Sequence, residues 1–250
     1  MANQEIEGNI LPSHENCVYT KCYCEENVWK MCEMITRNSG TNTIQRCFAV
    51  FVSNPLRMVP LWCQKASPDP LNKPVCWDYH VFLVYPSPSC SLVYDLDTIL
   101  PYPCTLDEYV SNTFISDNHL KPDYHRFFRV IPAVDYLRVF ASDRSHMLTD
   151  EGTWQATPPE YPCIQSECSK NNIQEFINME ADKGYGHVMK LEQFASIMKS
   201  LTLWKIYVQD TGTTDTKIGQ CDHIQESNDI SLTNGLIDEK SSDLNLLDNT

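Results

Sequence analysis

The feature that most limits the possible folds is a pair of apolar segments, residues 76–85 and 91–99, separated by a short loop. Both segments have strand length and are rich in Val, Leu, Phe and Tyr, a composition typical of β-strands. The intervening Pro86-Ser87-Pro88-Ser89 predicts a hairpin connection. The sequence therefore predicts an antiparallel sheet with this hairpin in it.

The length of the hairpin loop predicts which residues face one another. If residues 86–89 form the loop, Tyr85 lies opposite Cys90, and His80 lies directly across from Asp95. Side chains in such a pair have Cβ atoms about 4.5–5.5 Å apart. A carboxylate at this distance accepts a hydrogen bond from one imidazole nitrogen and leaves the other nitrogen free as a base.

A helix is predicted over residues 25–37, because apolar side chains recur there at helical spacing. Cys24 then lies at the start of this helix. Backbone N–H groups and the helix dipole favour a thiolate at such a position, so we expect a lowered pKa for Cys24. A cysteine, a histidine and an aspartate arranged in this way suit acyl transfer from an amide, with no metal and no cofactor.

The remaining patterns predict an α+β fold, a single domain with a mostly antiparallel sheet flanked by helices. A capping box at Thr105 marks one helix start, and a long irregular stretch covers 142–172. Further strands are predicted at 46–53, 58–64 and 124–132, and further helices at 105–116, 136–141, 173–179 and 191–199.

Charge and termini predict the domain organisation. The chain has 250 residues and a net charge of −14, and half of that charge lies in 209–250, which contains nine acidic and two basic residues and no aromatic residue. We expect an acidic disordered tail at 209–250, a flexible arm at 1–16 and a catalytic domain at 17–208. The absence of a basic stripe argues against nucleic acid as a partner. No apolar run reaches membrane-spanning length, and no signal peptide is evident.

The twelve cysteines contain no Cys-x-x-Cys pair, which argues against a structural zinc site. Most are expected to be reduced, buried thiols in a reducing compartment. Two other histidines, His146 and His187, are rival candidates for the base. The same register pairs Asp78 with Asp97, either as exposed strand-end residues or as ligands of a cation such as an α-ammonium group.

Four short motifs give the chain a family resemblance. Residues 77–81 read WDYHV, residues 22–30 read CYCEENVWK, residues 94–98 read YDLDT, and residues 140–147 read FASDRSHM. From about residue 17 to residue 200 the chain resembles the WDYHV-motif family of protein N-terminal glutamine amidohydrolases.

The resemblance implies a Cys24, His80 and Asp95 triad on a transglutaminase- or papain-like core. It implies a monomer in cytosol and nucleus that deamidates N-terminal Gln of proteins or peptides to Glu, releasing ammonia and feeding the N-degron pathway. Glu26 joins Asp78 and Asp97 as a candidate for binding the substrate's α-amine. The alternatives are a cysteine protease or transglutaminase on the same core, and a non-catalytic scaffold.

Overall fold

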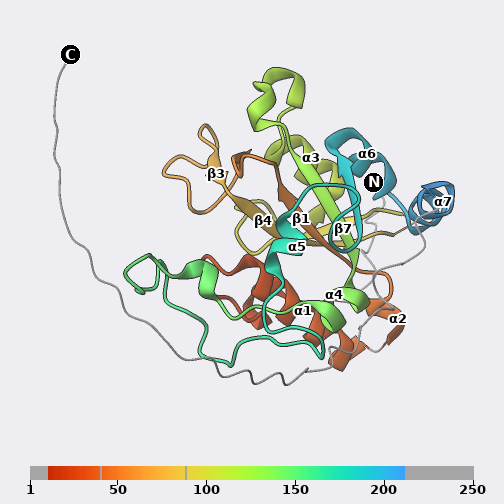
Figure 1. Cartoon of the computed structure of the whole chain (residues 1–250). Coiled ribbons are helices and arrows are strands. Elements are labelled where there is room, and N and C mark those ends of the chain that lie inside the picture. Colours follow the sequence, from red (N-terminus) through yellow and green to blue (C-terminus); the bar gives the residue numbers. More distant parts are fainter. Residues whose placement is uncertain (1–10, 40, 88, 212–250) are drawn as a thin grey trace, which may run out of the picture. The chain divides into compact units, whose positions relative to one another are not determined.

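The computed structural model describes residues 11–39, 41–87 and 89–211. An antiparallel six-stranded sheet in the order β6-β5-β4-β1-β7-β8 forms its centre (Figure 1). The strands of this sheet are β1 (Phe48–Ser53), β4 (Tyr79–Tyr85), β5 (Leu92–Tyr94), β6 (Cys104–Thr105), β7 (Phe127–Pro132) and β8 (His187–Lys190). A separate two-stranded sheet pairs β2 (Val59–Leu61) with β3 (Val75–Trp77). The expected α+β class with a mostly antiparallel sheet is confirmed.

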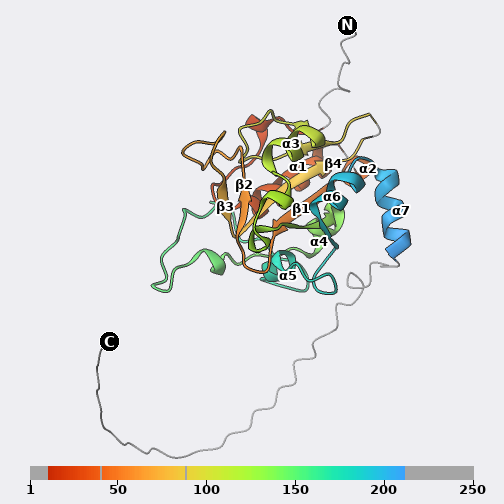
Figure 2. The ribbon, with the colours of Figure 1, turned by 90° about the horizontal axis from the view of Figure 1, so that it is seen from above.

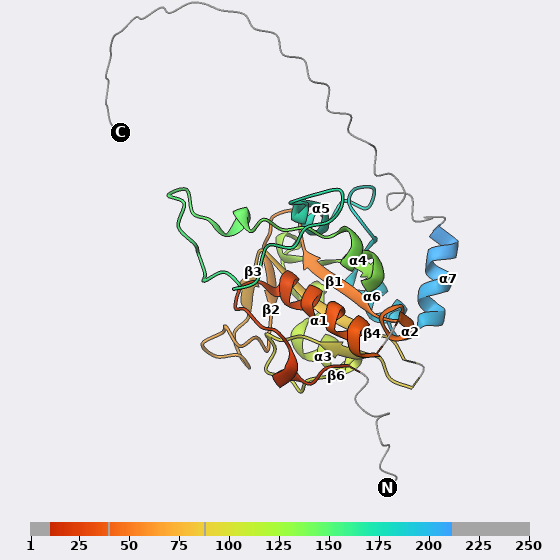
Figure 3. The same cartoon turned by 90° about the horizontal axis from the view of Figure 1, so that it is seen from below.

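Helices cover both faces of the large sheet, as the views from above and below show (Figures 2 and 3). The alternating side chains of β1 and β4 divide between two buried apolar clusters, one on each face. One face carries α1 (Cys24–Ser39), α2 (Thr41–Ile44), α4 (Ala133–Val139) and α5 (Ile173–Ile177), and the other carries α3 (Leu106–Thr113), α6 (Leu191–Ile197) and α7 (Leu201–Thr211). The short 3-10 turns are His14–Asn16, Asp117–His119, Pro122–Tyr124 and Ser145–Met147.

Helix α1 begins at Cys24, where the sequence places its start. Val28, Met31, Cys32 and Ile35 are buried against the sheet, which accounts for the helical spacing of these residues. The first turn is buried as well, because α1 packs against β4. This packing brings the thiol of Cys24 to the sheet.

The hairpin between β4 and β5 forms, but the predicted register was wrong by two residues. Tyr85 pairs with Leu92 rather than with Cys90. Ser91 is held outside the pairing, since its hydroxyl donates to the carbonyl of Lys199 and its own carbonyl accepts from the N–H of Leu106. A shift by two residues keeps every side chain on its predicted face, because strand side chains alternate with a period of two.

The predicted strand over 76–85 is two strands that bend apart at Asp78. Asp78 is exposed, and its carboxylate accepts a hydrogen bond from the N–H of Tyr79 (2.9 Å). Asp97 lies in the turn after β5 and is buried. The predicted pairing of Asp78 with Asp97 was therefore wrong.

The predicted terminal segments lie mostly outside the described residues, which begin at 11 and end at 211. Within the expected arm, Leu11 is buried in the core. Within the expected tail, residues 209–211 complete α7. In the described part of the chain, no helix combines the length and apolarity needed to cross a membrane.

Candidate active site

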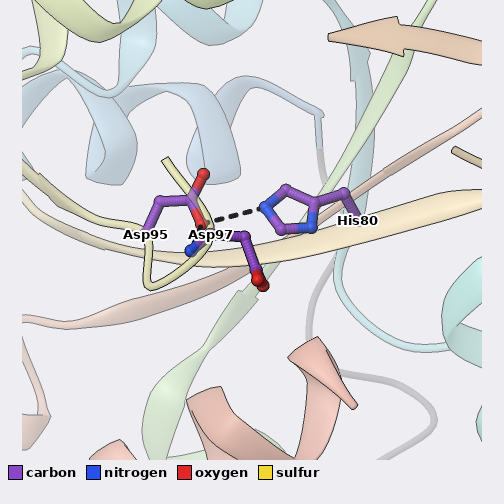
Figure 4. Close-up of side chains that lie close together, drawn as sticks. All are labelled: His80, Asp95 and Asp97. Carbon is purple, nitrogen blue, oxygen red and sulfur yellow. Dashed lines mark hydrogen bonds and ion pairs between the residues drawn. The ribbon is translucent and has the colours of Figure 1, made fainter. Parts of the chain in front are cut away.

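His80 and Asp95 are in direct contact at the centre of the site (Figure 4). The Nε2 atom of His80 lies 3.0 Å from Oδ1 of Asp95, and both side chains are buried. Nδ1 of His80 has no hydrogen-bond partner among the described residues. The predicted contact is therefore present despite the changed register, because Asp95 follows β5 directly and the chain turns there. One imidazole nitrogen is held by the carboxylate and the other is available.

Several side chains fix the orientation of this pair. Asp95 accepts hydrogen bonds from the hydroxyl of Tyr109 (2.8 Å), from Nε2 of Gln64 (3.4 Å) and from the N–H of Asp97 (2.9 Å). The indole ring of Trp77 stacks on the imidazole of His80, with centroids 5.5 Å apart and planes at 19°. These hydrogen bonds and the stacked ring hold the carboxylate and the imidazole in one orientation.

Cys24 lies beside the strand that carries His80. A hydrogen bond from the N–H of Val81, the residue after His80, lowers the pKa of the thiol. Burial is the largest influence and raises the pKa, and the charges of Glu25 and Asp97 raise it further, so the net pKa lies well above 9.0. The expectation of a lowered pKa was wrong, because burial and two nearby carboxylates outweigh the N–H groups at the helix start.

The charge on His80 is governed by two opposing effects. Burial lowers its pKa, whereas the charge and hydrogen bond of Asp95 raise it, and the net pKa lies above 6.5. The pKa of Asp95 is lowered, since His80 outweighs the effect of burial. The resting structure thus favours a neutral Cys24 thiol, and a His80 imidazole whose positive form is stabilised by a carboxylate.

One group of possible metal ligands occurs among the described residues, and it coincides with this site. His80, Asp95 and Asp97 each present a ligand atom within 4.8 Å of the others. One ring nitrogen of His80 and both carboxylates already bond to protein groups, however. Asp95 bonds to His80, and Asp97 accepts a hydrogen bond from the hydroxyl of Tyr19 (2.6 Å). Hydrogen bonding within the chain thus accounts for the cluster.

Two other cysteines and the rival base His187 make other contacts. Cys32 is in the apolar core, and Cys17 contacts the hydroxyl of Tyr102 (3.2 Å). His187 packs against Trp204 on the opposite face of the sheet.

Ten cysteines of the described segments have free thiols: Cys17, Cys22, Cys24, Cys32, Cys47, Cys63, Cys76, Cys90, Cys104 and Cys163.

The loop that follows α4 contributes two residues to the site region. Arg144 makes a bidentate ion pair with Glu26, with both N–O distances 2.8 Å. His146 lies 3.5 Å from Glu25 and 3.3 Å from the hydroxyl of Tyr79. The sequence named His146 as a rival base without a partner, and the FASDRSHM motif was a signal that this loop has a defined place. With Arg144 as its partner, Glu26 is not available to bind an amine.

A cavity of about 740 Å³ lies beside the start of α1, lined by residues 18–22 and 155–161. Tyr19 in its wall donates to Asp97, and Tyr23 donates to the carbonyl of the wall residue Ala156 (3.2 Å). The cavity therefore adjoins the segment that leads into Cys24.

Comparison with known proteins identifies the family. The sequence profile of the N-terminal glutamine amidase family matches residues 19–198. The chain is 51% identical over 186 residues to the protein N-terminal glutamine amidohydrolase of Danio rerio, covering 74% of this chain and 91% of that protein. It is 48% identical over 184 residues to that of Homo sapiens (73% and 88%), and 50% identical over 186 residues to that of Drosophila ananassae (74% and 90%). The profile matches most of the chain, and the relatives share about half of their aligned residues with it. This chain therefore belongs to the N-terminal glutamine amidase family.

Proposed function

We propose that this chain is a hydrolase that deamidates the side chain of an N-terminal glutamine, giving glutamate and ammonia by a cysteine thioester mechanism. The observation that carries the proposal is the His80–Asp95 pair, with Nδ1 of His80 free, on the strand against which the thiol of Cys24 packs. Family membership supports N-terminal glutamine as the substrate, because the relatives are named protein N-terminal glutamine amidohydrolases.

The first half-reaction forms the thioester. Sγ of Cys24 attacks the side-chain amide carbon while its proton passes to Nδ1 of His80. The N–H of Cys24 or of a neighbouring residue stabilises the oxyanion, an effect of about 3–4 kcal/mol in comparable sites. The imidazolium then donates its proton to the leaving nitrogen, which departs as ammonia. This is the arrangement of a transglutaminase- or papain-like core.

The second half-reaction consumes water. Nδ1 of His80 removes a proton from a water molecule, whose oxygen attacks the thioester carbon. The C–S bond breaks, Cys24 regains its proton, and the product carries a glutamate side chain. Asp95 keeps the imidazole in one orientation and stabilises its charged form throughout.

The resting neutral thiol is compatible with this scheme. Because the pKa of Cys24 is raised and that of His80 is also raised, proton transfer accompanies attack instead of preceding it. A buried, neutral thiol also limits reaction with small electrophiles in the absence of substrate. The resting thiol of Cys24 is therefore less reactive but more selective for the substrate.

We place the peptide chain that follows the substrate's first residue in the cavity lined by 18–22 and 155–161.

The cellular role follows from the product. A protein with a new N-terminal Glu becomes a substrate for arginylation, so the reaction feeds the N-degron pathway. We assign the enzyme to cytosol and nucleus and to the monomeric state.

An ammonia-release assay on three peptides tests the proposal. Peptides beginning with Gln, Asn and acetyl-Gln are incubated with the full chain, and the products are identified by mass spectrometry. Ammonia and an intact Glu peptide are expected from the Gln peptide alone. A cleaved or cross-linked peptide would instead indicate a protease or a transglutaminase.

A further inference from the structure

A buried carboxylate that the proposed mechanism does not use, Glu25, lies next to the nucleophile. Its side chain is 0% exposed, and Oε2 accepts hydrogen bonds from the hydroxyl of Tyr79 (3.0 Å) and from Sγ of Cys24 (3.7 Å). Oε1 has no hydrogen-bond partner in the described part of the chain, and Nε2 of His146 lies 3.5 Å from it. A buried carboxylate oxygen without a donor is costly, which indicates that a donor is supplied from outside.

The neighbouring acid shows that this arrangement is specific to Glu25. Glu26 is also 0% exposed, but both its oxygens bond to the guanidinium of Arg144 at 2.8 Å. The two acids of the first helical turn therefore differ: the chain neutralises Glu26 with a cation of its own, whereas Glu25 receives a phenol and a longer contact from His146. His146, which lies against Glu25, is partly exposed: its side chain is 14% exposed, while that of Glu25 is 0% exposed.

We propose that Oε1 of Glu25 binds the α-ammonium group of the substrate's N-terminal glutamine, with Tyr79 holding the carboxylate and His146 at the entrance. The inference rests on the proposed function and adds a subsite to it. An acetylated or internal glutamine has an uncharged amide nitrogen at this place, so the subsite excludes both.

The distances are compatible with simultaneous binding at both ends of glutamine. Sγ of Cys24 lies 3.7 Å from Oε2 of Glu25, the other oxygen of the carboxylate whose Oε1 is proposed to bind the ammonium group. An attacking sulfur lies about 3–3.5 Å from the amide carbon, and an ammonium–carboxylate bond is about 2.8 Å long. Glutamine's amide carbon and α-nitrogen are roughly 4–5 Å apart in an extended side chain, by standard bond lengths. Because Oε1 and Oε2 belong to one carboxylate, glutamine is long enough to reach both Sγ of Cys24 and Oε1 of Glu25, whereas asparagine is one methylene shorter.

Ammonium binding would also act on the nucleophile. The negative charge of Glu25 raises the pKa of Cys24. A bound ammonium group compensates that charge, so the thiol of Cys24 becomes easier to deprotonate only when a free N-terminus is present. The subsite thereby affects kcat as well as KM.

The test compares two substrates and two variants. The substrates are a peptide beginning with Gln and the same peptide with the α-amino group replaced by hydrogen. Wild type is expected to prefer the amine by about 10- to 100-fold in kcat/KM, the range for a hydrogen bond between charged groups. Glu25→Gln should lose most of this preference through a lower rate on the amine substrate alone. The matched control Glu26→Gln, one residue along, should keep it.

Three outcomes would overturn the assignment of Glu25 as the ammonium-binding residue. A Glu25→Gln variant with the full preference overturns the inference, as does a Glu26→Gln variant that alone loses it. A crystal structure of Cys24→Ala with the Gln peptide gives a second measurement that does not depend on the folding of Glu25→Gln. The ammonium nitrogen is expected within hydrogen-bond distance of Glu25, and its placement elsewhere overturns the inference. A wild type that releases no ammonia contradicts the proposed function itself.

Discussion

Asp95→Asn perturbs the site in the most informative way, because the amide has the shape of the carboxylate without its charge. The Asp95 carboxylate holds Nε2 of His80 at 3.0 Å and accepts the hydroxyl of Tyr109 at 2.8 Å. An asparagine has only one oxygen for these donors. When its NH2 group faces His80, the imidazole must carry its proton on Nδ1, and the base is lost.

The size and the pH dependence of the effect follow from the same contacts. We expect kcat to fall about 10³- to 10⁴-fold, which corresponds to roughly 4–5.5 kcal/mol in the barrier. Asp95 is also what raises the pKa of His80 against the effect of burial. The base works in its neutral form, above its pKa, so wild type should lose activity as pH falls through a value above 6.5. In Asp95→Asn this acid limb should move to lower pH.

The assay is ammonia release from a Gln peptide, with kcat/KM measured across the neutral and mildly acidic range. Tyr109→Phe is the matched control, since it removes one hydrogen bond to Asp95 and leaves the bond to His80; a loss below about tenfold is expected there. Thermal denaturation checks that both variants are folded. A fall of less than tenfold for Asp95→Asn, or an acid limb that stays in place, would contradict this role of Asp95.

Three further predictions concern the nucleophile and its helix. Cys24→Ala should abolish ammonia release while Cys32→Ala retains it, because Cys32 lies in the apolar core; turnover in Cys24→Ala would exclude it as the nucleophile. The pH titration of the Cys24 thiol in the resting enzyme, followed by thiolate absorbance, should have its midpoint above 9.0, and ionisation near neutral pH would contradict the geometry. Arg144→Met leaves the Glu26 carboxylate buried and unpaired, so the free energy of unfolding in urea should fall by about 3–5 kcal/mol. A fall below about 1 kcal/mol would mean that Glu26 finds another partner.

Local patterns in the sequence were sufficient to predict the frame of the site. The spacing of Val28, Met31 and Ile35 predicted α1, and with it the position of Cys24 at the helix start. The hairpin prediction had the wrong register but the right faces, since an error of two residues preserves side-chain alternation. The contact between His80 and Asp95 therefore did not depend on the loop length that was used to predict it.

Local sequence patterns did not predict which polar side chains are buried. A glutamate in the first turn of a helix is normally exposed, so nothing in the sequence indicated that Glu25 is enclosed by Tyr79 and His146. The burial of Cys24, with the charges of Glu25 and Asp97, likewise raises its pKa where the sequence predicted a lowered one. The sequence also predicted one long strand where the chain bends at Asp78, because composition reports strand preference and not the change of sheet.

The direct test of the enzyme and its nucleophile is the fate of a peptide with N-terminal Gln incubated with the full chain and with Cys24→Ala. We expect one ammonia released for each Glu peptide formed by the wild type, no reaction of the acetylated peptide, and no product with Cys24→Ala. Equal turnover of the free and acetylated peptides, or product formation without Cys24, would contradict it.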